Sequence, residues 1–219
     1  MNKENLQLVI FDMDGVIINS EPLHDAVYEQ IEHELAQGTK VSVENTTGTA
    51  AVDVYRRLIA VCPPAEVTPE ALATCHFERV WQKMIEMQLG AMDGLQDLLR
   101  LIADKGCIYA VASSSPRSFV ERCLTSVGML EGARAVICGD SGFLVKPAPD
   151  MFLAALKATG IPAQRAVVIE DSHAGTIAAK RARIRCIGLK NPDSGMQDLS
   201  SAGWLANNLS EAARIIATL

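Results

Sequence analysis

The sequence contains no basic tract, no long apolar run and no closely spaced pair of cysteines. Its formal net charge is −6 and its pI is about 5.3, which argues against nucleic acid and anionic membrane surfaces as partners. No apolar stretch approaches the roughly 18 residues that a membrane-spanning helix needs, and residues 1–5 are polar rather than a signal-peptide core. The six cysteines are scattered, and several lie in apolar runs, as buried free thiols do. We therefore expect a reduced, cytoplasmic protein with neither a nucleic acid nor a membrane as its partner.

The sequence does contain enough apolar material for a packed core. Hydrophobic residues make up 49% of the 219 residues and the mean hydropathy is +0.16, which argues against a disordered chain. The length exceeds the usual size of one domain and is a little short of two full domains. Because the net charge repels anions, an anionic substrate would have to be bound by local cations.

The most informative stretch is L-V-I-F-D-M-D-G-V at residues 8–16. Its continuous apolar run predicts a strand that is buried on both faces, as in a parallel sheet. Asp12 and Asp14 then lie at the carboxyl end of this strand, where open α/β sheets bind ligands, and Gly15 lets the backbone turn away. Alternate side chains share one face of a strand, so the two carboxylates would point the same way if the strand continued. Such a pair requires a cation or a shared proton between its members.

Residues 20–90 show helical periodicity and no convincing strand. Apolar residues recur at helical intervals over 23–36, 51–61 and 69–89, which predicts three helices. Ser20 is suited to be the N-cap of the first of them.

From about residue 92 onward, short apolar runs alternate with helical segments, which predicts βαβ units, right-handed crossovers and a parallel sheet. We therefore predict an α/β fold, a Rossmann-like parallel sheet flanked by helices, with an all-helical cap domain inserted after the first strand. The catalytic core would comprise residues 1–17 and 91–219, and the cap residues 18–90. The cap would stand over the strand ends.

Polar groups follow the apolar runs at the predicted strand ends. If the runs are parallel neighbours, four carboxylates, one lysine and a hydroxyl meet at one edge of the sheet. These groups belong to Asp12, Asp14, Ser113, Lys146, Glu170 and Asp171. Such an excess of acid favours a hard divalent cation with oxygen ligands, and Mg²⁺ suits a site that retains waters and substrate oxygens.

Charge suggests the role of each group. A carboxylate beside Mg²⁺ can attack phosphorus and become an aspartyl phosphate. A second carboxyl two residues on can protonate the leaving oxygen and then take a proton from the attacking water. Mg²⁺, Lys146 and nearby hydroxyl or N–H donors would stabilise the charge on the phosphoryl oxygens.

These residues resemble the haloacid dehalogenase superfamily of aspartate-nucleophile phosphohydrolases, in its branch with a helical cap. The resemblance covers nearly the whole chain and rests on four motifs in order. They are D-M-D-G-V from Asp12, the strand ending at Ser113, K-P-A-P-D from Lys146, and V-V-I-E-D-S from Val167. The resemblance implies that Asp12 is the nucleophile and Asp14 the acid/base.

The resemblance also implies the binding residues. Ser113 and Lys146, with Ser114 beside them, would hold the phosphoryl group. Mg²⁺ would be held by Asp12, the backbone carbonyl of Asp14, Asp171 and Glu170.

Several of these residues allow a second interpretation. Ser113, Ser114 or Ser115 could instead cap the helix after Pro116, and Glu170 could orient the site rather than bind metal. His24 is either a surface residue or a hinge or substrate residue near the two aspartates. His33 and His76 are interpreted as solvated or packed within the cap.

Together these observations predict a Mg²⁺-dependent phosphatase that acts on a small phosphorylated metabolite, such as a sugar or polyol phosphate. We expect a monomer or weak homodimer. The first alternative is a phosphomutase of the β-phosphoglucomutase type, and the second is a non-catalytic protein that binds a phosphorylated ligand. The mutases carry a cap arginine and a cap lysine, and this chain places Ala51 and Cys75-His76 near the corresponding positions.

Overall fold

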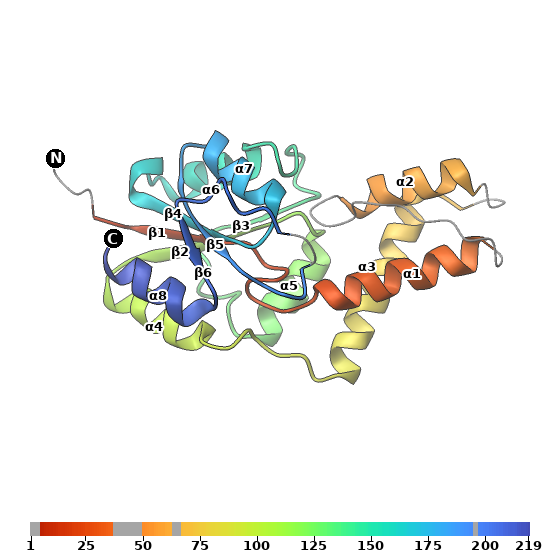
Figure 1. The fold of residues 1–219 in the computed structure, drawn as a ribbon, viewed down its shortest axis with the longest axis horizontal. Coiled ribbons are helices and arrows are strands. Elements are labelled where there is room, and N and C mark those ends of the chain that lie inside the picture. The colour runs from red at the N-terminus through yellow and green to blue at the C-terminus, as the bar shows by residue number, and fades with distance from the viewer. Residues whose placement is uncertain (1–4, 37–49, 63–66, 195–196) are drawn as a thin grey trace.

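The computed structural model describes residues 5–36, 50–62, 67–194 and 197–219. Its centre is a six-stranded sheet in the order β3-β2-β1-β4-β5-β6, in which every neighbouring pair is parallel (Figure 1). The strands are β1 (Leu8–Phe11), β2 (Ile108–Ser113), β3 (Val136–Cys138), β4 (Ala166–Glu170), β5 (Arg185–Leu189) and β6 (Trp204–Ala206). The predicted α/β class with a parallel sheet is confirmed.

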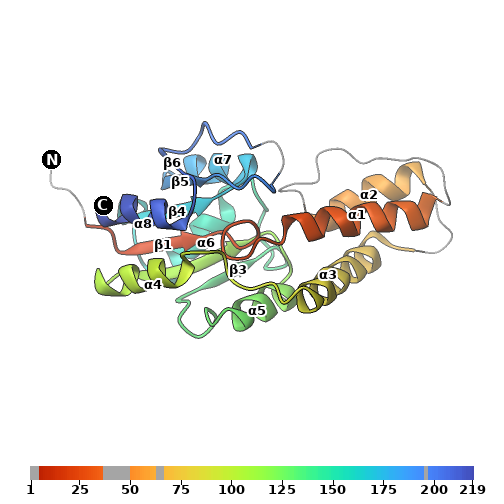
Figure 2. The same ribbon diagram turned by 60° about the horizontal axis from the view of Figure 1, so that its bottom comes forward.

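Helices cover both faces of this sheet. In β1, Leu8 and Ile10 face one layer of the core, whereas Val9 and Phe11 face the other, and all four side chains are fully buried. The first layer is closed by α6 (Asp150–Thr159) and α7 (His173–Arg181), and the second by α4 (Leu95–Asp104), α5 (Arg117–Ser126) and α8 (Leu209–Ala217) (Figure 2). Burial on both sides explains why β1 is a continuous apolar run.

Three further helices follow β1 and lie together beyond the carboxyl ends of the strands (Figure 1). They are α1 (Glu21–Ala36), α2 (Ala51–Val61) and α3 (Pro69–Glu86). Arg79 of α3 donates to Glu34 of α1 at 2.7 Å, and the ring of Tyr28 contacts that of Tyr55 across α1 and α2. This position agrees with the predicted cap. Its proposed range, 18–90, includes residues 37–49 and 63–66, which lie outside the described part, so the domain division stays a prediction.

The helices predicted over 23–36, 51–61 and 69–89 correspond to α1, α2 and α3, and their ends differ by a few residues. The start of α7 at His173 is set locally, because the Ser172 hydroxyl accepts a hydrogen bond from the Gly175 N–H at 2.9 Å and caps the helix there. In the described part of the chain, no helix has the length and apolar character needed to cross a membrane.

Candidate active site

The site begins where β1 ends. The Asp12 N–H donates to the Ile169 carbonyl at 3.0 Å, which fixes Asp12 at the strand end beside β4. Gly15 then turns the chain with a φ of 77°, and a Cβ at this position would lie 2.0 Å from an Asp171 carboxylate oxygen. Glycine is therefore required here for its backbone conformation and for the close approach of Asp171.

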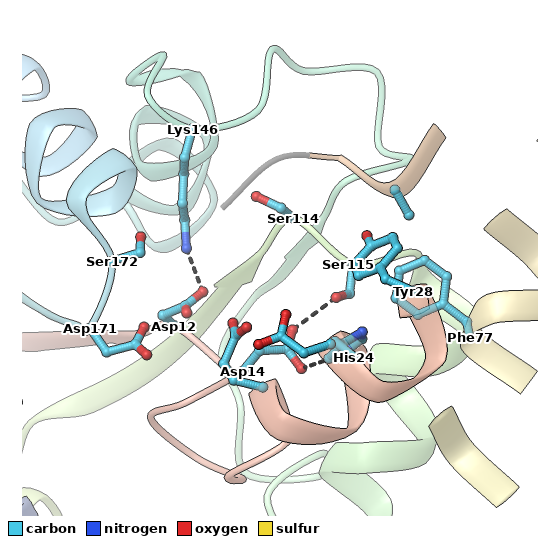
Figure 3. Close-up of a pocket in the computed structure, with 13 residues that line it drawn as sticks. Asp12, Asp14, His24, Tyr28, Phe77, Ser114, Ser115, Lys146, Asp171 and Ser172 are labelled. Carbon is cyan, nitrogen blue, oxygen red and sulfur yellow. Dashed lines mark hydrogen bonds and ion pairs between the residues drawn. The ribbon is translucent and has the colours of Figure 1, made fainter. Parts of the chain in front are cut away.

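A buried lysine lies among the carboxylates at these strand ends. The Lys146 ammonium forms an ion pair with Asp12 (Figure 3). It forms a second ion pair with Glu170, at 2.6 Å. Burial lowers the pKa of Lys146, but the charges and hydrogen bonds of the two carboxylates outweigh it and raise the pKa above its ordinary value. Lys146 is therefore a permanent cation at this position.

One lysine does not balance the acids around it. Asp12, Glu170 and Asp171 each place a carboxylate oxygen within 4.8 Å of the others, and all three are buried. Burial and the repulsion of Glu170 and Asp14 raise the pKa of Asp12 well above its ordinary value, although the charge of Lys146 acts in the opposite direction. The pKa of Asp171 is raised by burial and by repulsion from Asp12 and Glu170. This set of crowded oxygen donors fits a hard divalent cation such as Mg²⁺.

Glu170 is held in place by the start of α7. One oxygen accepts hydrogen bonds from the N–H and the hydroxyl of Ser172, each at 2.9 Å, and the other faces Lys146. Asp171 accepts a hydrogen bond from the Ser194 hydroxyl at 2.6 Å. The two carboxylates are thus oriented before any cation binds.

Asp14 has a different environment, which is rich in hydrogen-bond donors. Its carboxylate accepts bonds from the hydroxyls of Ser20 at 2.6 Å, Ser115 at 2.8 Å and Ser113 at 3.4 Å, and it lies 3.4 Å from the Nε2 atom of His24. Burial alone would raise the pKa of Asp14, but His24 and the hydroxyls of Ser20 and Ser115 lower it to about 2. The two aspartates of the D-M-D motif therefore have opposite pKa shifts.

Ser20 precedes α1, as the N-cap prediction required. Its carbonyl accepts the Leu23 and His24 N–H groups, whereas its hydroxyl donates to Asp14. The Ser20 hydroxyl therefore contacts the candidate active site, whereas its carbonyl accepts the first hydrogen bonds of α1.

A buried chain of polar rings leads from Asp14 into α3. The Nδ1 atom of His24 lies 2.8 Å from the Nε2 atom of His76, whose Nδ1 atom lies 2.7 Å from the Tyr55 hydroxyl. Burial and the charge of His24 lower the pKa of His76 to about 2, so this imidazole is neutral. His76 was interpreted as solvated or packed within the cap; it is fully buried there. Its pairing with His24 was not predicted.

Most of the predicted residues line one small pocket of about 70 Å³, whereas Ser113 and Glu170 are not part of its lining. Asp12, Asp14, Lys146 and Asp171 line it, together with Ser114, Ser115 and His24 (Figure 3). The buried Ser114 Oγ atom has no hydrogen-bond partner within the described residues, so it is available to a ligand.

Ser113 lies deeper than the pocket wall. Its hydroxyl oxygen accepts the Ser115 N–H at 3.1 Å, and the side chain is fully buried. Its phosphate-binding role stays a prediction. Ser115 contacts Asp14 more closely and was considered only as a helix cap, although its place next to Ser113 and Ser114 was a signal for it.

The comparison with known proteins identifies the family of the chain. Residues 6–183 match the model of the haloacid dehalogenase-like hydrolase family, and the chain belongs to that family. The resemblance found in the motifs is thereby confirmed, and the chain is an enzyme of the hydrolase class.

Its relatives include named phosphatases. The chain is 27% identical over 208 residues to validoxylamine A 7'-phosphate phosphatase of Streptomyces hygroscopicus subsp. limoneus, covering 94% of this chain and 95% of that one. It is 36% identical over 187 residues to the protein SUPPRESSOR OF QUENCHING 1 of Arabidopsis thaliana. That match covers 83% of this chain, which spans only 18% of the plant protein.

The fold also resembles that of a protein whose crystal structure was determined in complex with phosphate. CbbY from Rhodobacter sphaeroides, whose crystal structure was determined with phosphate, has a TM-score of 0.81 at 25% identity, with 94% of this chain and 96% of that chain covered. The architecture around the candidate active site is thus shared with a protein that binds phosphate.

Proposed function

We propose that this protein is a Mg²⁺-dependent phosphatase that hydrolyses a small phosphorylated metabolite, a sugar or polyol phosphate, through an aspartyl phosphate on Asp12. The observation that carries the proposal is the convergence of Asp12, Lys146 and Asp171 on one pocket that also contains Asp14. The relationship to a named phosphatase and to a phosphate-bound structure supports it.

The residues divide the reaction between them. An Asp12 oxygen attacks phosphorus, and the bond between phosphorus and the alcohol oxygen breaks as that oxygen takes a proton from Asp14. In the second half, Asp14 takes a proton from water while the water oxygen attacks phosphorus and releases Asp12. Lys146 and the unpaired Ser114 hydroxyl would bind the phosphoryl oxygens.

Asp12, Glu170 and Asp171 would hold the metal ion, with the backbone carbonyl of Asp14 as the ligand that the family resemblance implies. When bound, Mg²⁺ supplies positive charge that neutralises the carboxylates and the phosphoryl oxygens. The ion pair with Lys146 opposes protonation of Asp12 and orients its carboxylate. Asp14 must be protonated in the first half-reaction, and an approaching phosphoryl dianion would raise its pKa by repulsion.

The mutase alternative requires a site for a second phosphate on the reaction intermediate. Lys146 is the only lysine or arginine among the described residues that line the two cavities between the strand ends and α1–α3. The structure therefore favours hydrolysis, in which one phosphoryl group is bound at a time.

Phosphate release by the full chain tests the proposal. With Mg²⁺, the protein should release phosphate from sorbitol 6-phosphate or glucose 6-phosphate, and a chelator should abolish the release. Asp12→Asn should lower kcat by about 10⁴-fold or more, because an amide oxygen is a poor nucleophile. Asp97→Asn on the exposed face of α4 is the matched control. Equal rates for Asp12→Asn and the parent would refute the proposal. Conversion of glucose 1-phosphate to glucose 6-phosphate, stimulated by glucose 1,6-bisphosphate, would instead establish the mutase.

A further inference from the structure

A second and larger cavity adjoins the phosphate pocket. Its volume is about 400 Å³, and it shares Ala51, Phe77 and Ser114 with the small pocket around Asp12. Cavities of roughly 300–1,000 Å³ are typical of small-molecule sites. A phosphoester with its phosphorus at Asp12 would therefore place its alcohol portion in this cavity.

One wall of the cavity is apolar. The rings of Phe77 from α3 and Phe119 from α5 lie with their centroids 5.0 Å apart, and Ala51 and Ala73 also line the cavity. An apolar wall of this kind contacts the C–H surface of a carbon chain or ring. Hydroxyl side chains also line the cavity, from Thr74 and Ser118 as well as Ser114.

The charged residues in the described lining of the cavity are all acidic. Its described lining contains three carboxylates, those of Glu70, Glu78 and Asp140, and no lysine or arginine. Glu78 is paired with Arg122 at 2.6 Å, and Glu70 lies 3.8 Å from Arg56. Neither arginine contributes to the lining.

The Asp140 carboxylate also accepts a hydrogen bond from within the protein. Both of its oxygens accept the Arg117 N–H at 3.1 Å, at the start of α5. The three carboxylates therefore already have partners within the protein. A carboxylate accepts hydrogen bonds and donates none, so a ligand that meets these groups must supply donors.

We propose, on the basis of the proposed function, that this cavity selects the alcohol portion of the substrate by its hydrogen-bond donors and its charge. The preferred substrate is the phosphomonoester of a polyhydroxylated alcohol that is otherwise uncharged or carries an ammonium group. An alcohol that carries a carboxylate or a second phosphate is rejected, because the described lining places like charges around it and no cation. Glu70 and Glu78 are the specificity-determining residues.

A matched series of 6-phosphates tests this inference. Sorbitol 6-phosphate, glucosamine 6-phosphate, 6-phosphogluconate and glucose 1,6-bisphosphate differ in the charge of the alcohol portion. With Mg²⁺, kcat/KM should be at least about tenfold higher for the first two than for the last two, which corresponds to about 1.4 kcal/mol. Equal or higher values for the anionic pair would overturn the inference and leave the proposed function intact. No phosphate release from any ester would overturn both.

Charge-neutralising variants test the residues themselves. Glu78→Gln removes a negative charge and frees Arg122, so the ratio of kcat/KM for 6-phosphogluconate to that for sorbitol 6-phosphate should rise at least about threefold. Glu70→Gln should act in the same direction. Glu86→Gln, an equal charge change on the same helix but outside the cavity lining, should leave the ratio unchanged. A ratio that does not move in either cavity variant, or that moves equally in Glu86→Gln, would overturn the assignment.

Discussion

His24 and His76 meet ring nitrogen to ring nitrogen, at 2.8 Å, inside the helical part of the protein. The contact joins α1 to α3, and the Tyr55 hydroxyl extends it to α2 at 2.7 Å from His76. At the other end, His24 lies 3.4 Å from Asp14. Each of the three helices thus contributes one side chain to a chain of polar groups that reaches the proposed acid/base.

Removing the Tyr55 hydroxyl, the last of these polar groups, should destabilise the protein. Tyr55→Phe deletes one oxygen and leaves the Nδ1 atom of His76 without its partner, so the free energy of unfolding should fall by about 1–3 kcal/mol. Tyr28→Phe is the control, because the Tyr28 ring packs on the same imidazole with centroids 4.2 Å apart. Its loss should be smaller than that of Tyr55→Phe. Urea unfolding measures both, and equal losses would contradict the role of the Tyr55 hydroxyl.

The buried His76 should also make stability depend on pH. Its folded pKa is about 2, lowered by burial and by His24, whereas an unfolded histidine titrates near 6.5. Below pH 6.5 the unfolded state therefore binds a proton that the folded state does not, and stability falls as the pH falls.

His76→Gln isolates this contribution, because glutamine keeps a donor and an acceptor but does not titrate. Between pH 7 and pH 5, the stability of the parent relative to His76→Gln should fall by about 2 kcal/mol. Urea titrations at several pH values measure the difference. Parallel curves for the two proteins would show that His76 carries no such linkage.

The sequence predicted the part of the site that depends on strand ends. Asp12 and Asp171 converge because the carboxyl ends of parallel strands meet at one edge, and that rule needs only the order of apolar runs and motifs. Lys146 reaches the same pocket from the connection between β3 and α6. The pairing of His24 with His76 depends instead on how two helices rotate against each other. Periodicity identifies which helix face is buried, but it does not identify which residue on that face meets a residue 52 positions away.

Hydroxyl groups were the harder part of the prediction. Ser20 and Ser115 carry the ordinary signals of helix starts, and both donate to Asp14 instead. A serine side chain can satisfy its own backbone or a distant carboxylate equally well, and only the tertiary structure decides between them. Ser194 reaches Asp171 from a loop that carries no motif.

The first turn of α7 contains Gly175, where the neighbouring Glu170 leaves no space for a side chain. A Cβ at this position would lie 1.8 Å from a carboxylate oxygen of Glu170. Gly175→Ala should therefore displace Glu170, lower the free energy of unfolding by about 1–3 kcal/mol, and reduce phosphate release. Gly90→Ala is the control, because nothing lies within 4 Å of the added atom there. Thermal unfolding and activity assays compare the two, and a fully active Gly175→Ala would contradict the close packing of Glu170.

Lys146 is the protein's own cation in the carboxylate cluster, and its removal should make the protein depend on an added one. In Lys146→Met, the buried carboxylates of Asp12 and Glu170 lose their ion pair, which should cost about 3–5 kcal/mol of stability without metal. Turnover should fall by about 100-fold or more, because the phosphoryl group loses a bound cation.

Magnesium distinguishes this role from simple packing. A divalent ion at Asp12, Glu170 and Asp171 neutralises the charge that Lys146→Met leaves behind, and binding to the folded state alone stabilises that state. The rise in unfolding temperature between chelator and saturating Mg²⁺ should therefore be larger for Lys146→Met than for the parent. Lys157→Met, on the exposed side of α6, should match the parent. If Mg²⁺ raised the unfolding temperature of all three proteins equally, Lys146 and the metal would not share the same carboxylates, and the proposed ligand set would be wrong.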